Sequence, residues 1–376
     1  TEAVASFRML ELREPNRQLG RIELLALESG RDPVATGEAM AREVRELVQK
    51  HPDQPSLRTQ LGAILLSQEK IDEAEAEFRA ALKADDRYAP ALLGLAQIAL
   101  RRGKAEEALE FVRQPLKMNP NDLQANLVAA QAETARGRID DAAKYYEVIL
   151  SVNPKIAVAN VALAQVRLAR GNMRDASRYA RAALQEDPKI PGAHLVLGNV
   201  AVSERRYDEA VQHFQRVLET HTNEASAYSG LAYAHWRKGQ RDQAVRAYRR
   251  AIELAPNDPR PQNNLAWLLA DDRAHHDEAL RLAQRAVSAS PRNGWFVDTL
   301  GWVYYQQGKL TDAEQQFRLA VDLLPNEAMA QYHLGLVAHK QGRTVEAMSA
   351  LKRALLINPQ FDEAAAAQKM LRELGG

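Results

Sequence analysis

Aromatic side chains are the residues of this chain best suited to binding a partner, and they are concentrated in one region. All four tryptophans lie between positions 236 and 302. The candidates for a binding surface are these four and neighbouring rings: Tyr233, Trp236, Trp267, Trp295, Trp302, Tyr305, Tyr332 and His333. Aromatic rings offer large contact area at little entropic cost and are enriched at the centres of protein interfaces. Their types favour recognition of a protein or peptide ligand, unless the rings only fill gaps between packed helices.

Amide side chains accompany these rings. Asn263 and Asn264 come just before Trp267, and Asn199 lies in an equivalent slot of an earlier segment. We expect Asn263, Asn264 and His333 to hydrogen-bond an exposed partner backbone, because amides both donate and accept hydrogen bonds. Aromatic faces flanked by amides also suit sugar rings, so a carbohydrate-binding module is an alternative function.

One cluster has side chains of the types that bind metals, namely His275, His276, Asp277 and Glu278, after Asp271 and Asp272. Adjacent histidines on a loop diverge, and no His-Glu-x-x-His spacing sets two ligands on one helical face. We interpret the cluster as a solvated charged turn and predict no metal site.

Charge and composition disfavour several other functions. Lys plus Arg is 50 against 49 for Asp plus Glu, and cysteine is absent. One basic run could touch phosphate: Arg237, Lys238, Arg241, Arg246, Arg249 and Arg250. We interpret it as a solvated outer face and predict no nucleic-acid partner. Without a phosphate loop, a Gly-x-Ser-x-Gly elbow or a thiol, the sequence predicts no catalytic residues and no cofactor.

The elements that must position these residues follow from residues 294–325. Leu300 and Tyr304 lie four apart on one helical face, and Gly301 beside them lets a second helix approach. Gly308 is expected to end this first helix. Ala313, Phe317 and Ala320 then form the facing stripe of a second helix, and Pro325 ends it: the pattern is a helical hairpin.

The rest of the chain consists of imperfect copies of this hairpin. A slot that recurs every 34 residues, with one step of 35, is filled by Asp86 and Thr222 in two units and otherwise by proline: Pro52, Pro120, Pro154, Pro188, Pro256, Pro291, Pro325 and Pro359. The first helices carry one small residue at a fixed slot: Gly62, Ala96, Ala130, Ala164, Gly198, Ala232, Ala266, Gly301 and Gly335. The second helices carry an alanine at the matching slot, from Ala74 to Ala347. Small residues facing each other allow close helix packing.

This spacing resembles the tetratricopeptide repeat, a 34-residue helix-turn-helix. The resemblance implies an all-α fold, an α-α solenoid forming a right-handed superhelix of about ten tandem units with a C-terminal capping helix. It also implies a concave groove lined by the first helices, where the candidate residues would face a partner.

The expected organisation has four parts. Residues 1–15 would be the second helix of a truncated repeat, residues 16–54 a degenerate repeat, residues 55–361 nine repeats, and residues 362–376 a capping helix and tail. Pro115 should kink or shorten its helix, since proline removes a backbone hydrogen bond.

The C-terminal half resembles bacterial tetratricopeptide proteins associated with exopolysaccharide export and PEP-CTERM sorting. The strings NNLAWLLADD and DTLGWVYYQQGK carry this resemblance. It implies a non-enzymatic scaffold in envelope or exopolysaccharide assembly, periplasmic or envelope-associated, with a cytoplasmic location as the alternative. The chain could also be the non-catalytic repeat region of a larger enzyme. No stretch is apolar over enough residues to insert into a membrane, and the sequence does not fix the oligomeric state.

Overall fold

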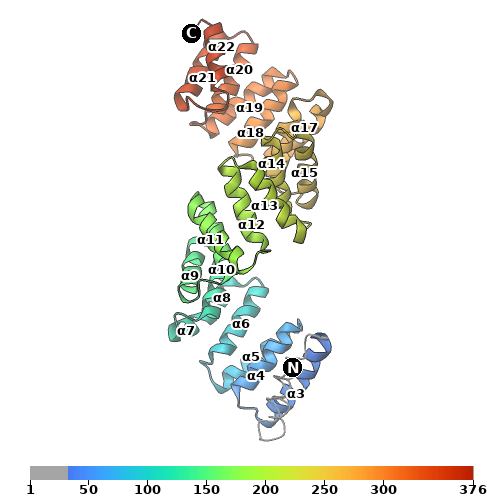
Figure 1. The fold of residues 1–376 in the computed structure, drawn as a ribbon, viewed down its shortest axis with the longest axis vertical. Helices are drawn as coiled ribbons and strands as arrows, with labels where there is room; N and C mark the ends of the chain where they lie inside the picture. Colours follow the sequence, from blue (N-terminus) through green and yellow to red (C-terminus); the bar gives the residue numbers. More distant parts are fainter. Residues whose placement is uncertain (1–32, 376) are drawn as a thin grey trace. The chain divides into compact units, whose positions relative to one another are not determined.

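The computed structural model describes residues 33–375, and they form helices joined by short turns, with no strand among them (Figure 1). The expected all-α solenoid of tandem helical repeats is confirmed. Residues 1–15 and 16–32, which were assigned to a truncated and a degenerate repeat, lie outside the described residues, as does Gly376. The described chain divides into two units, which end and begin at Pro188 and Lys189.

The first unit contains helices α3 to α11. Their bounds are α3 Pro33–Lys50, α4 Pro55–Ser67, α5 Ile71–Ala84, α6 Ala89–Arg101, α7 Ala105–Met118, α8 Leu123–Ala135, α9 Ile139–Val152, α10 Ala157–Ala169 and α11 Met173–Glu186.

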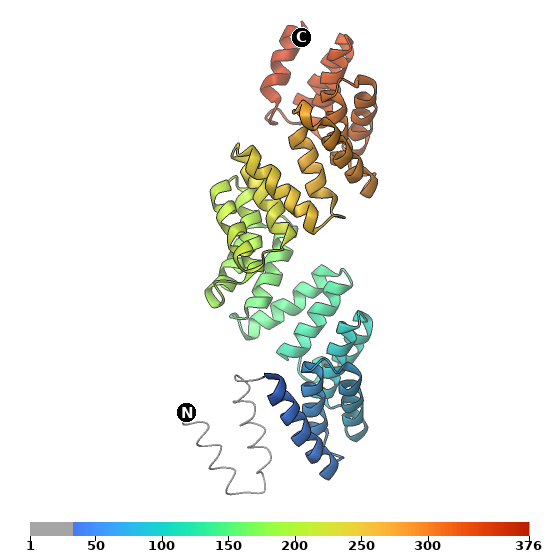
Figure 2. The ribbon, with the colours of Figure 1, turned by 90° about the vertical axis from the view of Figure 1, so that its right-hand side faces the viewer.

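The second unit contains helices α12 to α22. Their bounds are α12 Pro191–Ser203, α13 Tyr207–Thr220, α14 Ala225–Arg237, α15 Arg241–Leu254, α16 Pro259–Ala270, η1 Arg273–His275, α17 His276–Ala289, α18 Gly294–Gln306, α19 Leu310–Leu323, α20 Ala328–Lys340, α21 Thr344–Ile357 and α22 Ala364–Glu373. Within each unit, successive helices pack as antiparallel pairs (Figure 2).

The turns inside the pairs need a left-handed residue. In six of them a glycine has φ between 72° and 76°: Gly103, Gly137, Gly171, Gly239, Gly308 and Gly342. Glycine adopts this conformation without the steric cost that a Cβ imposes. Glu69 and Arg205 hold the same place in α4–α5 and α12–α13 with φ of 61° and 59°, so these two turns carry backbone strain.

Large side chains on the second helices enter spaces left by small residues on two first helices. Phe78 on α5 packs over Gly62 of its own pair and Gly94 of the next, where an added Cβ would lie 2.8 and 2.4 Å from the ring. Phe214 on α13 repeats this arrangement with Gly198 and Gly230. The pairs are therefore joined by matching sizes across three helices.

Two irregular units are accommodated without breaking the repeat. Pro115 is buried inside α7, which still spans 14 residues as α5 and α9 do, so the expected shortening is wrong. Pro115 lies in the last turn of α7, and its carbonyl accepts from the Asn119 amide at 2.8 Å. The extra residue in the turn after α16 is absorbed by η1, a short 3₁₀ helix.

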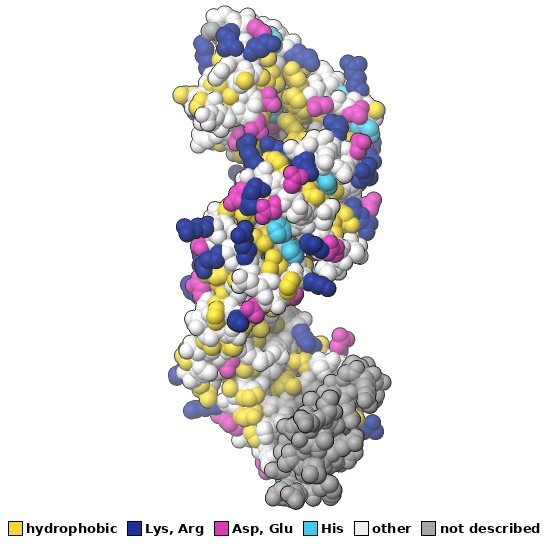
Figure 3. All heavy atoms as spheres, viewed as in Figure 1, with side chains coloured by type: hydrophobic (Ala, Val, Ile, Leu, Met, Phe, Trp, Pro, Cys, Tyr) yellow, Lys and Arg dark blue, Asp and Glu magenta, His cyan; other side chains and the backbone are white. Residues whose placement is uncertain are grey.

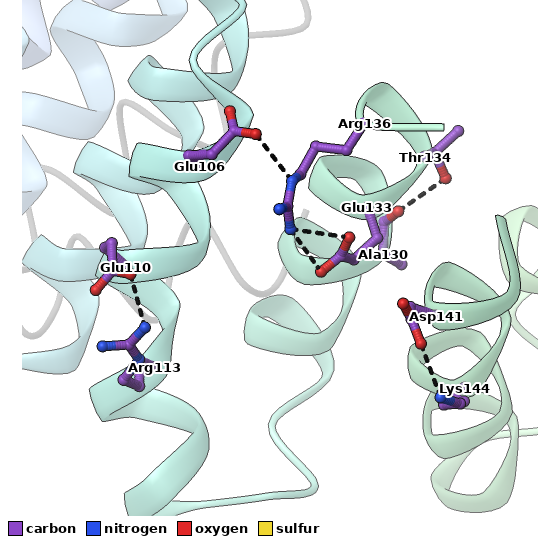
Figure 4. A network of polar contacts seen from close by, with 9 residues as sticks. All are labelled: Glu106, Glu110, Arg113, Ala130, Glu133, Thr134, Arg136, Asp141 and Lys144. Carbon is purple, nitrogen blue, oxygen red and sulfur yellow. Dashed lines mark hydrogen bonds and ion pairs between the residues drawn. The ribbon is translucent and has the colours of Figure 1, made fainter. Parts of the chain in front are cut away.

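Polar contacts in the first unit cross between neighbouring pairs. Arg136, after α8, donates from Nε to Glu106 of α7 at 2.9 Å and from Nη1 to Glu133 at 3.2 Å (Figure 4). Acidic and basic side chains are interspersed over the face drawn in Figure 3. This distribution agrees with the nearly balanced charge of the sequence.

Candidate binding groove

The first helices of the second unit enclose a groove of about 550 Å³. Side chains from α14, α16, α18 and α20, with the residue that precedes α18, line it: Tyr233, Trp236, Arg260, Asn263, Asn264, Trp267, Asn293, Trp295, Phe296, Asp298, Thr299 and Met329. We call these twelve residues the aromatic groove. Its volume falls in the range of sites that hold small molecules or a few peptide side chains.

Trp295 presents the most accessible ring in the groove. It stands in the first turn of α18, where Asn293 caps the helix by accepting from the Trp295 amide at 3.1 Å. Its side chain is 51% exposed, unusual for so large an apolar group. Because the cap and the helix hold its backbone, the ring is available to a partner without local unfolding.

Three aromatic rings form a stack that begins at the groove residue Trp267. Trp267 on α16 stacks on Trp302 of α18 with centroids 5.2 Å apart, and Trp302 stacks on Tyr305 at 5.4 Å. The Lys340 ammonium lies 4.6 Å from the centre of the Tyr305 ring, and burial raises the pKa of the Tyr305 hydroxyl. Trp267 lines the groove, whereas Trp302 and Tyr305 are partly buried and are not among its lining residues.

A buried hydrogen-bonded pair joins α20 to Asp298, one of the lining residues of the groove. His333 on α20 is 2% exposed, and its Nδ1 lies 2.9 Å from both carboxylate oxygens of Asp298 on α18. The imidazole packs against Trp302 at 4.9 Å and Phe317 at 5.2 Å. Where Phe78 and Phe214 meet a glycine of the following pair, Phe317 meets the His333 ring instead.

The two predicted site residues on α20 belong to the core. His333 uses Nδ1 for Asp298, so the expectation that it reaches a partner backbone is not met through that atom. Tyr332 is also buried, packed against Phe361, and burial raises the pKa of its hydroxyl. Both side chains are therefore part of the buried core, and His333 contacts the groove through Asp298.

Asn263 supplies a polar floor with an unused acceptor. Its side chain is 8% exposed, and its Nδ2 makes only a long contact of 3.4 Å with Oδ1 of Asn264. The Asn263 Oδ1 is buried and has no hydrogen-bond partner. A buried acceptor left unpaired costs about 1–3 kcal/mol, which a ligand donor can recover.

The positive charge at the rim of the groove is neutralised. Arg260 donates from Nη2 to Asp258 at 2.7 Å, and Asp258 also accepts from the Arg260 backbone amide at 3.0 Å. These hydrogen bonds to Arg260 lower the pKa of Asp258, and the carboxylate in turn raises the pKa of Arg260.

The structure brings six of the predicted site residues together in the groove: Tyr233, Trp236, Asn263, Asn264, Trp267 and Trp295. Asn199 is exposed on α12 and does not line it. The sequence interpretation missed Arg260, Asn293, Phe296, Asp298, Thr299 and Met329. Repeat equivalence could have found two of them, since Asp298 and Thr299 follow Asn263 and Asn264 by one repeat of 35 residues.

Residues 33–375 contain neither a metal-binding cluster nor a membrane-spanning helix. His275 Nδ1 lies 2.9 Å from Asp272, but no group of three or more His, Cys, Asp or Glu side chains there is arranged to hold a metal ion. None of the described helices combines the length and apolar character needed to cross a bilayer.

Family models place the repeats. Models described as tetratricopeptide repeat match residues 65–133, 112–155, 192–257, 229–294 and 299–366, which together make up most of the chain. The chain belongs to the tetratricopeptide repeat family. Proteins of this family generally act as non-catalytic scaffolds for protein interaction, and the described residues fit that role.

Similar proteins come from distant sources. The chain is 38% identical over 73 residues to the TPR repeat-containing protein PA4667 of Pseudomonas aeruginosa, covering 19% of this chain and 12% of that protein. It is 31% identical over 104 residues to the cell division cycle protein 27 homolog of Caenorhabditis elegans, covering 27% and 13%. The chain therefore matches only about an eighth of the length of these relatives.

A solved structure supports the fold. The crystal structure of the APC/C hetero-tetramer Cut9-Hcn1 matches with a TM-score of 0.59 at 15% identity, covering 95% of this chain and 86% of that chain. At this level of identity the likeness concerns the fold alone.

Proposed function

We propose that the chain is a non-enzymatic scaffold that binds an extended peptide or a partner helix in its aromatic groove. The observation that carries this proposal is the half-exposed Trp295 ring beside the buried, unpaired Asn263 acceptor. An exposed tryptophan offers a partner apolar contact, and an unpaired acceptor on the floor can orient the partner through a hydrogen bond. Folding stability alone would favour neither an exposed tryptophan ring nor an unpaired buried acceptor.

Selection from a library of displayed random dodecapeptides tests the proposal. Peptides that bind the full chain should bind Trp295→Ala about 30-fold more weakly, because truncating a central tryptophan in an interface costs about 2 kcal/mol. Affinity is measured by calorimetry, after circular dichroism has shown that the variant has the same helix content.

Leu356→Ala is the matched control. Leu356 is 73% exposed on α21 and lies outside the groove, so its truncation removes exposed apolar surface without touching the site. Affinity should remain within twofold. Equal binding by all three proteins would overturn the proposal, as would a selection that yields no binder.

We place this activity in bacterial envelope or exopolysaccharide assembly. The strings NNLAWLLADD and DTLGWVYYQQGK support this placement, and the similar segment in a Pseudomonas aeruginosa protein agrees with a bacterial setting. Pull-downs from separate envelope and cytosolic fractions test it. If a partner is captured only from the cytosolic fraction and is lost with Trp295→Ala, the scaffold function is supported and the envelope location is contradicted.

A carbohydrate ligand is a second candidate, favoured by the amides of Asn263 and Asn293 beside the Trp295 ring. Titration with bacterial exopolysaccharide, followed by tryptophan fluorescence, separates it from the peptide. Saturable quenching that Trp295→Ala abolishes, together with a failed peptide selection, would favour the sugar.

A further inference from the structure

Asp298 is the one carboxylate among the residues that line the aromatic groove. Arg260 and Asp298 are the two ionised side chains among its lining residues. Arg260 is already paired with Asp258. Asp298 accepts the Nδ1–H of His333, which lies 2.9 Å from both carboxylate oxygens. Each oxygen carries two lone pairs, so acceptor sites remain beyond those that one N–H uses.

The floor of the groove offers acceptors from two neighbouring first helices. Asn263 and Asp298 occupy equivalent repeat positions on the neighbouring first helices α16 and α18, and both are at least nine-tenths buried. The Asn263 Oδ1 has no partner. An acidic ligand group would be repelled by Asp298, and an apolar group would leave Asn263 unpaired.

The walls suit a planar cation. Trp267 and Trp295 line the same groove from α16 and α18, and Trp236 lines it from α14. A guanidinium stacks on indole faces and presents five N–H donors in one plane. It can therefore satisfy two acceptors while its faces contact rings.

We propose that the groove receives an arginine side chain of the partner peptide, with Asn263 Oδ1 and the Asp298 carboxylate accepting from its guanidinium. This inference rests on the proposed function, because it specifies which peptide the groove binds. The occupant is thus a basic extended segment rather than an acidic or purely apolar one.

The sharpest test changes the peptide and leaves the protein intact. Dodecapeptides that require Trp295 are synthesised with each arginine replaced by citrulline, which keeps the shape and removes the charge. We expect one arginine per peptide to be essential, with affinity falling at least 10-fold on its replacement. The readouts are calorimetry and tryptophan fluorescence.

A protein variant gives an independent test in the opposite direction. Asn263→Asp places a second carboxylate at the floor and should tighten binding of the arginine peptide about fivefold, with no gain for the citrulline peptide. The control is Asn199→Asp, which adds the same charge on an exposed first-helix position outside the groove. It should change affinity by less than twofold.

The outcomes separate this inference from the function on which it rests. Peptides that need Trp295 but tolerate citrulline at every arginine, or contain no arginine, overturn the inference and leave the peptide-binding scaffold standing. Failure to obtain any peptide that depends on Trp295 overturns both. An essential arginine together with the gain from Asn263→Asp supports both.

Discussion

The two units form grooves from the same repeat positions and line them with different chemistry. In the first unit a groove of about 610 Å³ lies along α4 and α6, with Ala63 and Gln97 where the second unit has Trp267 and Trp302. Thr59 stands where the second unit has Asn263. The repeat geometry thus fixes where a groove forms, and the residues at a few slots decide what it can bind.

The polar floors of the two grooves differ in a way that bears on function. The Thr59 hydroxyl is satisfied within its own helix, at 3.0 Å from the Pro55 carbonyl and 2.9 Å from that of Ser56. The Asn263 carbonyl has no partner. A floor residue that is already hydrogen-bonded gains nothing from a ligand, whereas an unpaired acceptor contributes to the free energy of binding when a ligand supplies a donor.

The largest expected difference between the units concerns their ion pairs. His333→Leu leaves the Asp298 carboxylate buried without its donor and should cost about 4 kcal/mol. Arg45→Leu in the first unit removes a pair with Glu73 in which the two side chains are 44% and 56% exposed, and that lost pair should cost about 1 kcal/mol or less. Urea denaturation followed by circular dichroism measures both. Equal losses would mean that burial does not distinguish the pairs.

Enlarging a glycine that faces a phenylalanine ring should destabilise the two units to a similar extent. Gly230→Val drives a side chain into the Phe214 ring, where even a Cβ would lie 2.3 Å away, and should cost about 3 kcal/mol. Gly94→Val against Phe78 is the first-unit equivalent.

Shrinking the phenylalanine provides the control for this prediction. In the first unit the smaller Val112 occupies the phenylalanine slot that precedes Val128, so Phe214→Ala should accommodate Val at position 230. The double variant should lose about 2 kcal/mol less than the sum of the single losses. Additive losses in thermal unfolding would refute the matched packing.

An aromatic ring alone should not transfer binding to the first unit. Gln124 is the repeat equivalent of Trp295, and it lines the first-unit groove. Adding Gln124→Trp to Trp295→Ala should leave the lost peptide affinity unrestored, because the floor of that groove lacks Asn263 and Asp298. Stability should change by less than about 0.5 kcal/mol, as for other exposed sites. Recovery of affinity in calorimetry would show that rings suffice.

A gain in stability is expected at the strained turns. Glu69→Gly in the first unit and Arg205→Gly in the second should each raise the free energy of unfolding by about 1 kcal/mol, since both backbones are left-handed. Gly103→Ala, at a turn that already has glycine, should lower it by a similar amount. The midpoints of urea denaturation measure the three changes, provided that the dependence of the unfolding free energy on urea concentration stays the same. If neither glycine substitution raises the midpoint, the two turns are not strained.

Sequence periodicity is enough to establish the fold class and to locate the aromatic side chains on first helices. Helical periodicity, small residues at matched slots and prolines every 34 residues leave few other ways to bury these apolar faces. The same periodicity put Trp267 and Trp295 on first helices, because side chains at fixed repeat positions share one face.

Tertiary structure decided which candidates could reach a partner. His333 and Trp302 share the periodicity of exposed groove residues, but the Phe317 ring and the Asp298 carboxylate hold His333 in the core. Local spacing cannot show this, because burial depends on what the neighbouring repeats contribute. The unpaired Asn263 acceptor likewise appears only once every possible donor around it has a position in space.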